Sequence, residues 1–507
     1  MADNGAIEQL TPRALTYVVG HDGSGRVGRE PVTDFVKATR QVVTDTTLTG
    51  GGALSSDLTL GLSVASVASL ALANSSLQPG DIGTTVATEA QGAKADTALQ
   101  QSSNLSDLGS IPTAISNLRL DARYLRLTSR GYYDLQTDFG SPTGSDWTAP
   151  FSAMLDACMN DIVPGTIRRG AFNVDSAIVK TFPFTTSVLE LEGYGPGSII
   201  NLVGEFSTNS NIALQFTYLG LYNAVRMRNL VMQTNSTSGA VVGVSLVCPP
   251  GITGNSFAQS TEFDRVTFKG SDGYATGTYF ATCIQTMRLN NVFIDLCGFY
   301  GPGVAVGDSL GRGTLLDFQS DTGNYAVKYS VTRSKLFQFT NAIRLGNYVQ
   351  ELVLDSSEIV GGSIGVLVPT GQIANDGIII NASHINARTY GAYIQATAAT
   401  NLSVGAGTYM ILNDTNACGV SYAGSYGRIE GSGFALTSGS NTGQAGVRLT
   451  SGANRCIVKG NNYTNLTNGN VFHTGSQNST MEGNQYDNVT TPYVNNGTGN
   501  SVGIATT

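Results

Sequence analysis

Apolar residues in the C-terminal two-thirds of the chain follow neither the spacing of an amphipathic helix nor the strict alternation of a two-faced strand. In the segment IIINASHINARTYGAYI, Ile380 and Ile385 lie five residues apart, and a short apolar run, GAYI, begins at Gly391. The same arrangement recurs in later and earlier segments. The first apolar positions of the clearest copies are 23 to 29 residues apart, and they are Leu354, Ile380, Val404, Ile429, Val458 and Met481.

A repeat of about 25 residues with two or three short apolar strands predicts an all-β, right-handed parallel β-helix. We expect about ten coils over residues 166–507, with like residues stacked roughly 4.8 Å apart. Small residues between the two apolar positions form a bend, and the glycine before each third strand is expected to start that strand after a turn. The second inward positions are predicted to be Ile359, Ile385, Tyr409, Phe434, Tyr463 and Tyr486.

Looser copies of the repeat lie upstream, where wider gaps imply insertions in the turns. The alternative is a β-sandwich with accidental spacing, but sandwich strands do not repeat one register many times in succession. The upstream pairs of inward positions are Val331/Leu336, Leu289/Ile294, Phe263/Phe268, Met227/Met232 and Leu189/Tyr194.

Residues 1–130 lack this period. They contain LTGGGALSSDLTLGLS (48–63), TTVATEAQGAKADTALQ (84–100) and NLSDLGSIPTAISNLRL (104–120). In type and order these stretches resemble the shaft modules of tailed-bacteriophage tail fibres and tailspikes. The resemblance implies a virion attachment region at 1–47, in contact with a phage tail or baseplate protein, and an extended fibre-like shaft with short helices at 48–130. Single copies of such polar segments cannot form a core, so we expect a homotrimer, with a disordered linker as the alternative.

Residues 131–165 resemble the entry segment of pectate-lyase-like β-helices in tailspikes. Asp138-Phe139-Gly140 supplies a turn, and a helix is predicted over 148–160 with Asp146 as its N-cap. We expect this helix to cover the open end of the coil stack. The acidic pair that this family usually carries before the helix is reduced here to GSDWT (144–148), which weakens the case for an enzymatic relative. The predicted buried face of the helix is Phe151, Met154, Leu155 and Cys158.

Composition narrows the possible functions. Of 507 residues only 13% are charged, with 62 glycines and a net charge of −8. Without a long basic run, nucleic acid is not an expected partner. The six cysteines are widely spaced, which favours buried thiols, and the three scattered histidines argue against a zinc site, so no metal or cofactor is expected. The start MADNGAIEQL is not a secretory signal, and the longest apolar run is too short to cross a bilayer, so we expect assembly in the host cytoplasm without membrane insertion.

Outward positions of the coils supply candidate acid–base groups. The residue after each first inward position is expected to form a solvent-facing column that includes Asp355, and position four gives Glu358 and then His384 one coil later. Glu351 and Asp376 are nearby. Such a set suits glycoside hydrolysis, which uses two carboxylates, or lyase chemistry, which uses a base. The alternative is that these charges only keep the surface soluble.

Sugar binding requires aromatic faces and neutral hydrogen-bonding groups. We expect glycan contacts around the loops at 250–261, 270–282 and 307–330, with core packing as the alternative role for their aromatic residues. The candidates are Tyr274, Tyr279, Tyr300, Tyr325 and Tyr348.

The sequence therefore predicts a bacteriophage tailspike or tail fibre, located in the virion, that binds a host capsule, exopolysaccharide or lipopolysaccharide. Depolymerisation of that polysaccharide, by hydrolase or lyase chemistry, is left open. The alternative is a non-enzymatic structural or adhesive fibre that serves as a platform for another receptor-binding protein. A free polysaccharide lyase fits less well, because the first 130 residues resemble a shaft.

Overall fold

The computed structural model describes most of the chain from residue 131 to residue 503 and several short upstream ranges. Within 131–503 the residues outside this description are 221, 252–258, 274–276, 302–312 and 437–441. The upstream ranges are 17–21, 27–31, 41–42, 48–49, 52–53 and 61–76. The chain divides into two units, Met1–Asn117 and Leu118–Thr507.

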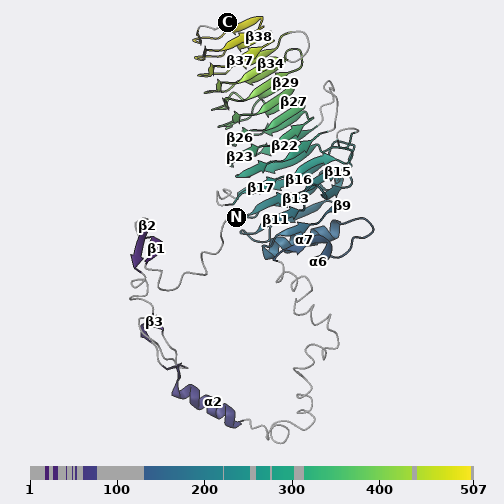
Figure 1. The fold of residues 1–507 in the computed structure, drawn as a ribbon, viewed down its shortest axis with the longest axis vertical. Coiled ribbons are helices and arrows are strands. Elements are labelled where there is room, and N and C mark those ends of the chain that lie inside the picture. Colours follow the sequence, from purple (N-terminus) through teal and green to yellow (C-terminus); the bar gives the residue numbers. More distant parts are fainter. Residues whose placement is uncertain are drawn as a thin grey trace. The chain divides into compact units, whose positions relative to one another are not determined.

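Strands of the second unit stack one above another as three parallel ladders, which confirms the parallel β-helix (Figure 1). The first ladder is a 14-stranded sheet. Its strands are β7 (Tyr133–Asp134), β8 (Gly165–Ile167), β11 (Val188–Gly193), β14 (Ala224–Arg228), β17 (Thr261–Asp264), β20 (Val292–Asp295), β23 (Ala326–Thr332), β26 (Val349–Asp355), β28 (Ile379–Asn381), β30 (Ser403–Val404), β33 (Arg428–Glu430), β36 (Ile457–Lys459), β39 (Thr480–Glu482) and β42 (Ser501–Val502).

The second and third ladders together form a 22-stranded sheet, because β27 (Glu358–Val368) and β29 (His384–Ile394) run through both. The other strands of the second ladder are β9 (Gly170–Val174), β12 (Ser198–Leu202), β15 (Val231–Thr234), β18 (Thr267–Gly270), β21 (Gly298–Tyr300), β24 (Lys335–Phe337), β31 (Tyr409–Leu412), β34 (Gly433–Leu436), β37 (Asn462–Thr464) and β40 (Gln485–Asp487). Those of the third ladder are β10 (Ile178–Thr181), β13 (Ile212–Thr217), β16 (Val242–Val247), β19 (Thr282–Met287), β22 (Thr314–Gln319), β25 (Asn341–Leu345), β32 (Cys418–Tyr422), β35 (Ala445–Leu449), β38 (Asn468–Phe472) and β41 (Thr491–Asn495).

Strand register confirms the first inward column predicted from Val331 onward. Each of these residues pairs with its counterpart one coil away, and all are buried: Val331, Leu354, Ile380, Val404, Ile429, Val458 and Met481. The second column is correct at Ile359, Ile385, Phe434 and Tyr463. Tyr486 holds the last predicted place and is partly buried.

Two predicted inward residues, Tyr409 and Tyr194, are exposed, and two others, Leu289 and Leu189, are buried but do not belong to the predicted column. The bend after Val404 holds one residue more than the others, so Met410 is the inward residue and Tyr409 is exposed. Upstream, the first inward residue of its coil is Ile294, which pairs with Val331, and not Leu289. Leu191, and not Leu189, pairs with Met227. Insertions in the turns removed the constant spacing that locates these positions from sequence alone.

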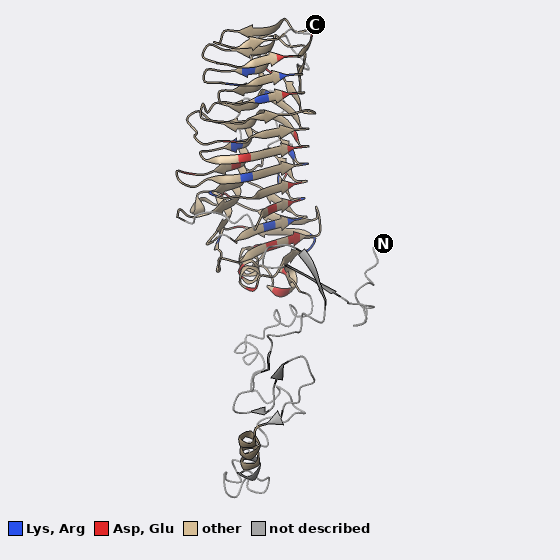
Figure 2. Cartoon of the chain, turned by 90° about the vertical axis from the view of Figure 1, so that its left-hand side faces the viewer, with Lys and Arg blue, Asp and Glu red and all other residues tan. Residues whose placement is uncertain are grey.

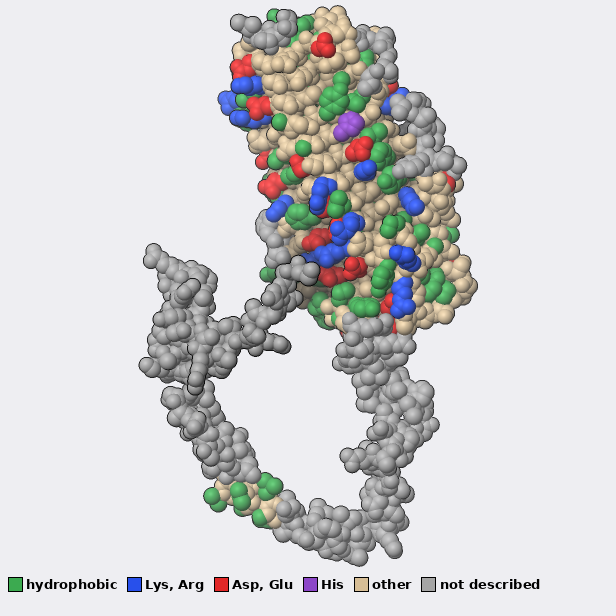
Figure 3. All heavy atoms as spheres, in the orientation of Figure 1, with side chains coloured by type: hydrophobic (Ala, Val, Ile, Leu, Met, Phe, Trp, Pro, Cys, Tyr) green, Lys and Arg blue, Asp and Glu red, His purple; other side chains and the backbone are tan. Residues whose placement is uncertain are grey.

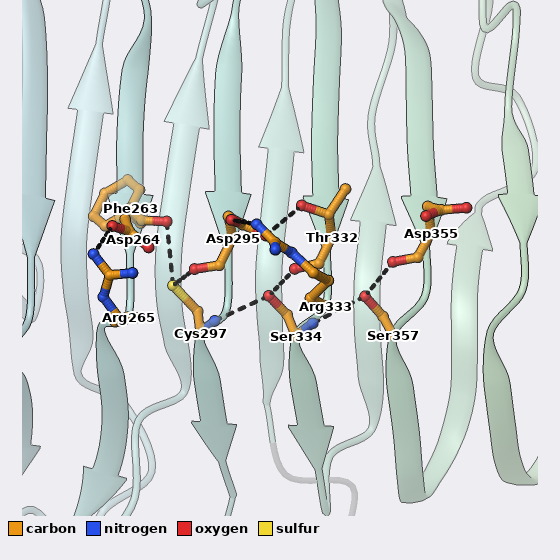
Figure 4. A network of polar contacts seen from close by, with 10 residues as sticks. All are labelled: Phe263, Asp264, Arg265, Asp295, Cys297, Thr332, Arg333, Ser334, Asp355 and Ser357. Atoms are coloured by element: carbon orange, nitrogen blue, oxygen red, sulfur yellow. Dashed lines mark hydrogen bonds and ion pairs between the residues drawn. The ribbon is translucent and has the colours of Figure 1, made fainter. Parts of the chain in front are cut away.

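The bend between the first two ladders has a repeated construction. After Leu354, Asp355 points outward, Ser356 adopts a left-handed conformation with φ 50°, and Ser357 is buried. The buried hydroxyl of Ser357 accepts a hydrogen bond from the backbone N–H of Ser334, in the preceding coil, at 3.1 Å. Figure 4 shows that the Ser334 hydroxyl accepts the backbone N–H of Cys297 in the same way. Small polar residues are therefore selected here because they satisfy backbone donors that the bend removes from the ladders.

Glycines of the third ladder have a different role from the one predicted. Gly365, Gly391 and Gly419 stack in register inside strands, and none has a positive φ. A β-carbon on Gly391 would lie 2.5 Å from Sδ of Met410 and 2.7 Å from the carbonyl oxygen of Gly419. These glycines make room for the large inward residue of the next coil rather than starting the strand after a turn.

The entry segment matches its prediction closely. Helix α7 (Thr148–Asp161) follows the short α6 (Leu135–Asp138) and contacts β8 to β11 at the base of the stack (Figure 1). Oδ1 of Asp146 caps the helix by accepting the Thr148 backbone N–H at 2.8 Å, although Trp147 occupies the N-cap position. The predicted face is buried in full: Phe151, Met154, Leu155 and Cys158.

In the first unit the description is limited to short elements. The strands β1 (Tyr17–His21) and β2 (Val27–Pro31) are antiparallel, as are β3 (Gln41–Val42) with β5 (Gly52–Ala53) and β4 (Leu48–Thr49) with β6 (Gly61–Leu62). Helix α2 spans Val64–Ser76. The predicted shaft segments at 84–100 and 104–120 lie outside the described residues. No helix in the described ranges is long and apolar enough to cross a membrane.

Candidate functional site

The predicted acid–base residues lie on two neighbouring ladders. Glu358 and His384 are register partners at the start of β27 and β29, whereas Asp355 ends β26 on the first ladder. Lys335 precedes Glu358 in the same column, with Nζ 3.7 Å from Oε2 of Glu358. The His384 ring stacks on Tyr409 with 6.1 Å between centroids. The structure thus brings Glu358 and His384 together in an open, outward row.

Asp355 and Asp376 are engaged differently. Oδ2 of Asp355 accepts the Ser356 hydroxyl at 2.8 Å. Oδ1 of Asp376 accepts hydrogen bonds from Thr400 Oγ1 at 2.6 Å and Asn401 Nδ2 at 2.7 Å. The second of these carboxylates is therefore tied into the turn that follows, which suits a structural role.

The predicted sugar-binding tyrosines do not form one surface. Tyr325 and Tyr348 meet edge to face, with centroids 5.4 Å apart, and Tyr300 stacks on Phe337 one coil away. Tyr279 is buried, so its ring is not available to a sugar. Tyr274 lies outside the described residues.

The stretch 307–330 was expected to be an insertion, but its described part holds core strands. β22 lies in the third ladder between β19 and β25, and Leu316 and Phe318 are fully buried. β23 belongs to the first ladder. The alternation of apolar residues in these strands was concealed by the irregular spacing of the upstream coils.

A charged groove of about 450 Å³ lies on the outer face of the first ladder, over the N-terminal coils. Three of its carboxylates are bound by arginines. Two of these pairs join neighbouring coils, Arg228 with Glu262 at 2.8 Å and Arg333 Nε with Asp295 at 2.9 Å, and the third joins the adjacent residues Arg265 and Asp264 at 2.6 Å. Figure 4 shows Asp264, Asp295, Thr332 and Asp355 following one another from coil to coil. Figure 2 shows charged residues on successive strands of the stack, and on the face drawn in Figure 3 many charged side chains lie over its N-terminal half.

Two carboxylates in the charged groove, Asp295 and Glu262, are poor proton donors. Burial alone would raise the pKa of Asp295, but hydrogen bonds from Arg333 and Thr332 outweigh it and lower that pKa. For Glu262, burial is likewise outweighed by hydrogen bonds from Ser260 and Arg228, which lower its pKa. Because both groups stay ionised and paired, neither is suited to act as the general acid of glycoside hydrolysis. The groove is explained as a set of ion pairs between coils.

A second groove, of about 550 Å³, follows the outer face of the third ladder over the C-terminal coils. Its floor is built by one outward residue per coil, at consecutive register positions: Tyr393, Ser421, Arg448, Val471 and Val494. Four steps between coils give this row a length of roughly 19 Å. We call this surface the tyrosine groove.

Two aromatic rings stand at one end of the tyrosine groove. The rings of Tyr390 and Tyr393 stack with centroids 3.8 Å apart and planes 2° from parallel. Gln395 donates a hydrogen bond from Nε2 to the Tyr393 hydroxyl oxygen at 2.6 Å, which fixes the orientation of that ring. A rigid pair of this kind offers an apolar ring face at little cost in side-chain entropy.

The remaining lining of the tyrosine groove combines the apolar Ile394 and Ala423 with several polar side chains. It includes Thr370, Thr450, Ser451, Asn468 and His473. Burial and the neighbouring charge of Arg448 lower the pKa of His473 below its usual value. A neutral imidazole, hydroxyls and amides can donate and accept hydrogen bonds with sugar hydroxyls.

Sequence reasoning missed this surface, although a signal for it was present. Four of the five floor residues stand two positions after a third-ladder glycine: Tyr393 follows Gly391, Ser421 follows Gly419, Arg448 follows Gly446 and Val471 follows Gly469. Reading the outward column at that offset would have placed these side chains next to one another.

The three ladders define this chain as a parallel β-helix protein. No protein-family model matches it, and no curated protein sequence does. Solved structures with a similar fold include a surface adhesin, PfbA of Streptococcus pneumoniae, at 13% identity and a TM-score of 0.46, covering 72% of this chain and 93% of the adhesin.

Two further structures extend this comparison. A mutant of DFA-IIIase from Arthrobacter chlorophenolicus A6, in complex with DFA-III, is 10% identical with a TM-score of 0.47, covering 71% of this chain and 94% of the enzyme. Tailspike protein 3 of bacteriophage CBA120 is 13% identical with a TM-score of 0.36, covering 75% of this chain and 58% of the tailspike.

Proposed function

We propose that this protein is a bacteriophage tailspike or tail fibre that binds a bacterial surface polysaccharide along the tyrosine groove. The observation that carries the proposal is the groove itself, where stacked rings, one cation and several short polar side chains line an outward row on rigid strands. Aromatic faces next to neutral hydrogen-bonding groups suit pyranose rings better than peptide or nucleic acid. The phage origin is supported by the resemblance of residues 48–120 to shaft modules.

Length and stiffness of the groove favour a polymer over a small sugar. Five coils contribute to its floor, and every contributing strand is paired on both sides or lies in the last coil. Because the backbone is fixed by these ladders, little ordering is required when an extended chain binds.

The test is a binding measurement on Tyr393→Ala, with Tyr426→Ala as the matched control. Both tyrosines lie on the same stack, but Tyr426 is exposed outside the tyrosine groove. Retention of each purified protein on immobilised surface polysaccharides of candidate host bacteria is compared with wild type. We expect Tyr393→Ala to lose most of its binding and Tyr426→Ala to bind normally. Equal binding by both variants would place the glycan elsewhere.

Two parts of this function concern assembly. We expect a homotrimer, with residues 1–47 attached to a phage tail or baseplate protein. Light scattering on the purified chain gives its mass in solution, and a monomer at working concentration would contradict the trimer. If the chain binds no polysaccharide but forms trimers and attaches to tails, the platform for another receptor-binding protein is the better description.

A further inference from the structure

We propose that the glycan in the tyrosine groove is acidic, and that Arg448 is the residue that pairs with a carboxylate on it. This inference rests on the proposed function and adds the chemical class of the ligand. It follows from the charge of the groove, the lack of a protein partner for one guanidinium, and the position of that guanidinium in the row.

Among the described residues that line the tyrosine groove, Arg448 is the only fully charged side chain, and none is Asp or Glu. Two arginines nearby have carboxylate partners. Arg344 on the third ladder lies 3.8 Å from Asp317, and Arg388, just before the third-ladder part of β29, lies 3.2 Å from Asp414. Arg448 has no ion pair with any residue in the described part of the chain.

A half-buried guanidinium without a counter-charge is unfavourable in the free protein and gains from an anionic ligand. Its planar fork matches a carboxylate in a bidentate arrangement, which a lysine cannot reproduce. The strand register holds Arg448 between Ser421 and Val471, so its Cα is fixed and the side chain reaches into the groove. In the free protein, burial and this same charge lower the pKa of His473, which lies beside Arg448 in the lining of the groove.

The row also separates two recognition tasks. Arg448 stands two coils from Tyr393, which is roughly 10 Å. One sugar residue can therefore stack on the tyrosine pair while a later residue of the same polymer presents its carboxylate to Arg448. A polymer that repeats a uronic acid at regular intervals meets both requirements.

The experiment uses the full chain and paired probes. Bacterial capsule polysaccharides that contain uronic acids are immobilised in their native form and in a carboxyl-reduced form, in which each carboxylate has become a primary alcohol. Wild type, Arg448→Gln, Arg448→Lys and the control Arg428→Gln are compared. Arg428 is an exposed arginine on the first ladder, outside the tyrosine groove.

We expect wild type to prefer the native polymers, and Arg448→Gln to weaken that binding by about 10- to 100-fold while leaving the reduced polymers unaffected. Arg448→Lys should recover part of the loss, and Arg428→Gln should bind as wild type does. Since Arg448 points outward, thermal unfolding of the variants should match wild type.

The outcomes distinguish this inference from the proposed function. Equal binding of native and reduced polymers by wild type, lost in Tyr393→Ala, would overturn the acidic ligand and retain the glycan groove. Unchanged binding by Arg448→Gln would remove Arg448 from recognition. A wild-type protein that retains neither form of any polymer would overturn both statements.

Discussion

The carbonyl oxygen of Gly446 lies 2.6 Å from the position that a β-carbon on Gly419 would occupy. Adding that methyl group would push a backbone carbonyl of the next coil, which cannot rotate away. We expect Gly419→Ala to lower the free energy of unfolding by about 1–3 kcal/mol, as overpacking usually does. Chemical denaturation measures the change. Gly197→Ala is the control, because its nearest neighbour is the flexible side chain of Arg169 at 3.3 Å, and an equal loss in both variants would contradict the steric explanation.

A charge in the inward column should prevent folding of the stack. Ile380 is fully buried between Leu354 and Val404 of the neighbouring coils. Ile380→Asp places a carboxylate where no partner exists, so we expect little soluble protein and no cooperative unfolding. Ile380→Ala should fold and lose about 2–5 kcal/mol. Normal assembly of the Asp variant, seen by sizing and circular dichroism, would mean that this side chain does not face the core.

One bend carries a residue whose conformation suits glycine better. Ala382 has φ 44°, and the equivalent positions in later coils are Gly407, Gly431 and Gly460. A left-handed backbone conformation costs a residue with a β-carbon roughly 1–2 kcal/mol, and glycine avoids this cost. Part of that gain is cancelled, because glycine also increases the conformational entropy of the unfolded chain. We expect Ala382→Gly to stabilise the protein by up to about 1 kcal/mol in thermal unfolding. A lower melting temperature would show that the strain is relieved in another way.

Acid should weaken the ion pairs of the first ladder. The folded pKa of Asp295 is lower than its unfolded pKa, because the hydrogen bonds from Arg333 and Thr332 outweigh burial. The stabilisation is therefore complete above the unfolded pKa of about 4 and is lost as the pH falls through the folded pKa. In unfolding curves from pH 7 to pH 2 we expect Asp295→Asn to lose less stability than wild type below about pH 4. Asp355→Asn, which removes no arginine pair in the described structure, is the control.

Catalysis by the predicted acid–base row has a direct assay. Glu358 and His384 are register partners, so they stand roughly 4.8 Å apart along the stack, close enough to share a proton through a hydrogen bond or one water. If the protein depolymerises its ligand through this row, Glu358→Gln and Asp355→Asn should reduce capsule-clearing halos by at least about 100-fold. Halos of normal size in both variants would exclude these residues, and no halo from wild type would favour a binding protein without hydrolysis.

Much of the fold could be predicted because inward residues repeat at nearly constant spacing. From Val331 onward that spacing identified buried positions correctly, apart from the extra residue before Met410. Upstream, the turns are longer, and Leu289 was wrongly predicted as the first inward residue in place of Ile294. Spacing alone does not show where a turn ends and the next strand begins.

The candidate site was harder to predict than the core. Outward residues follow no common pattern of residue types. Only the strand register of the third ladder shows that Tyr393 and Arg448 belong to the same row. The sequence also does not show which charged side chains form ion pairs. From the sequence alone, Asp295 would be taken for an available carboxylate, but Arg333 from the next coil already binds it.

Stacked glycines such as Gly391, Gly419 and Gly446 also set how such a chain can change length. Because the three ladders continue in register from one coil to the next, removing one complete coil would join two similar surfaces, whereas removing half of one would misalign all three ladders. The length of the groove can therefore change only by whole coils. A related chain that gains or loses a coil would have a longer or shorter outer groove, while the entry helix and its contacts with the first coil remain as they are.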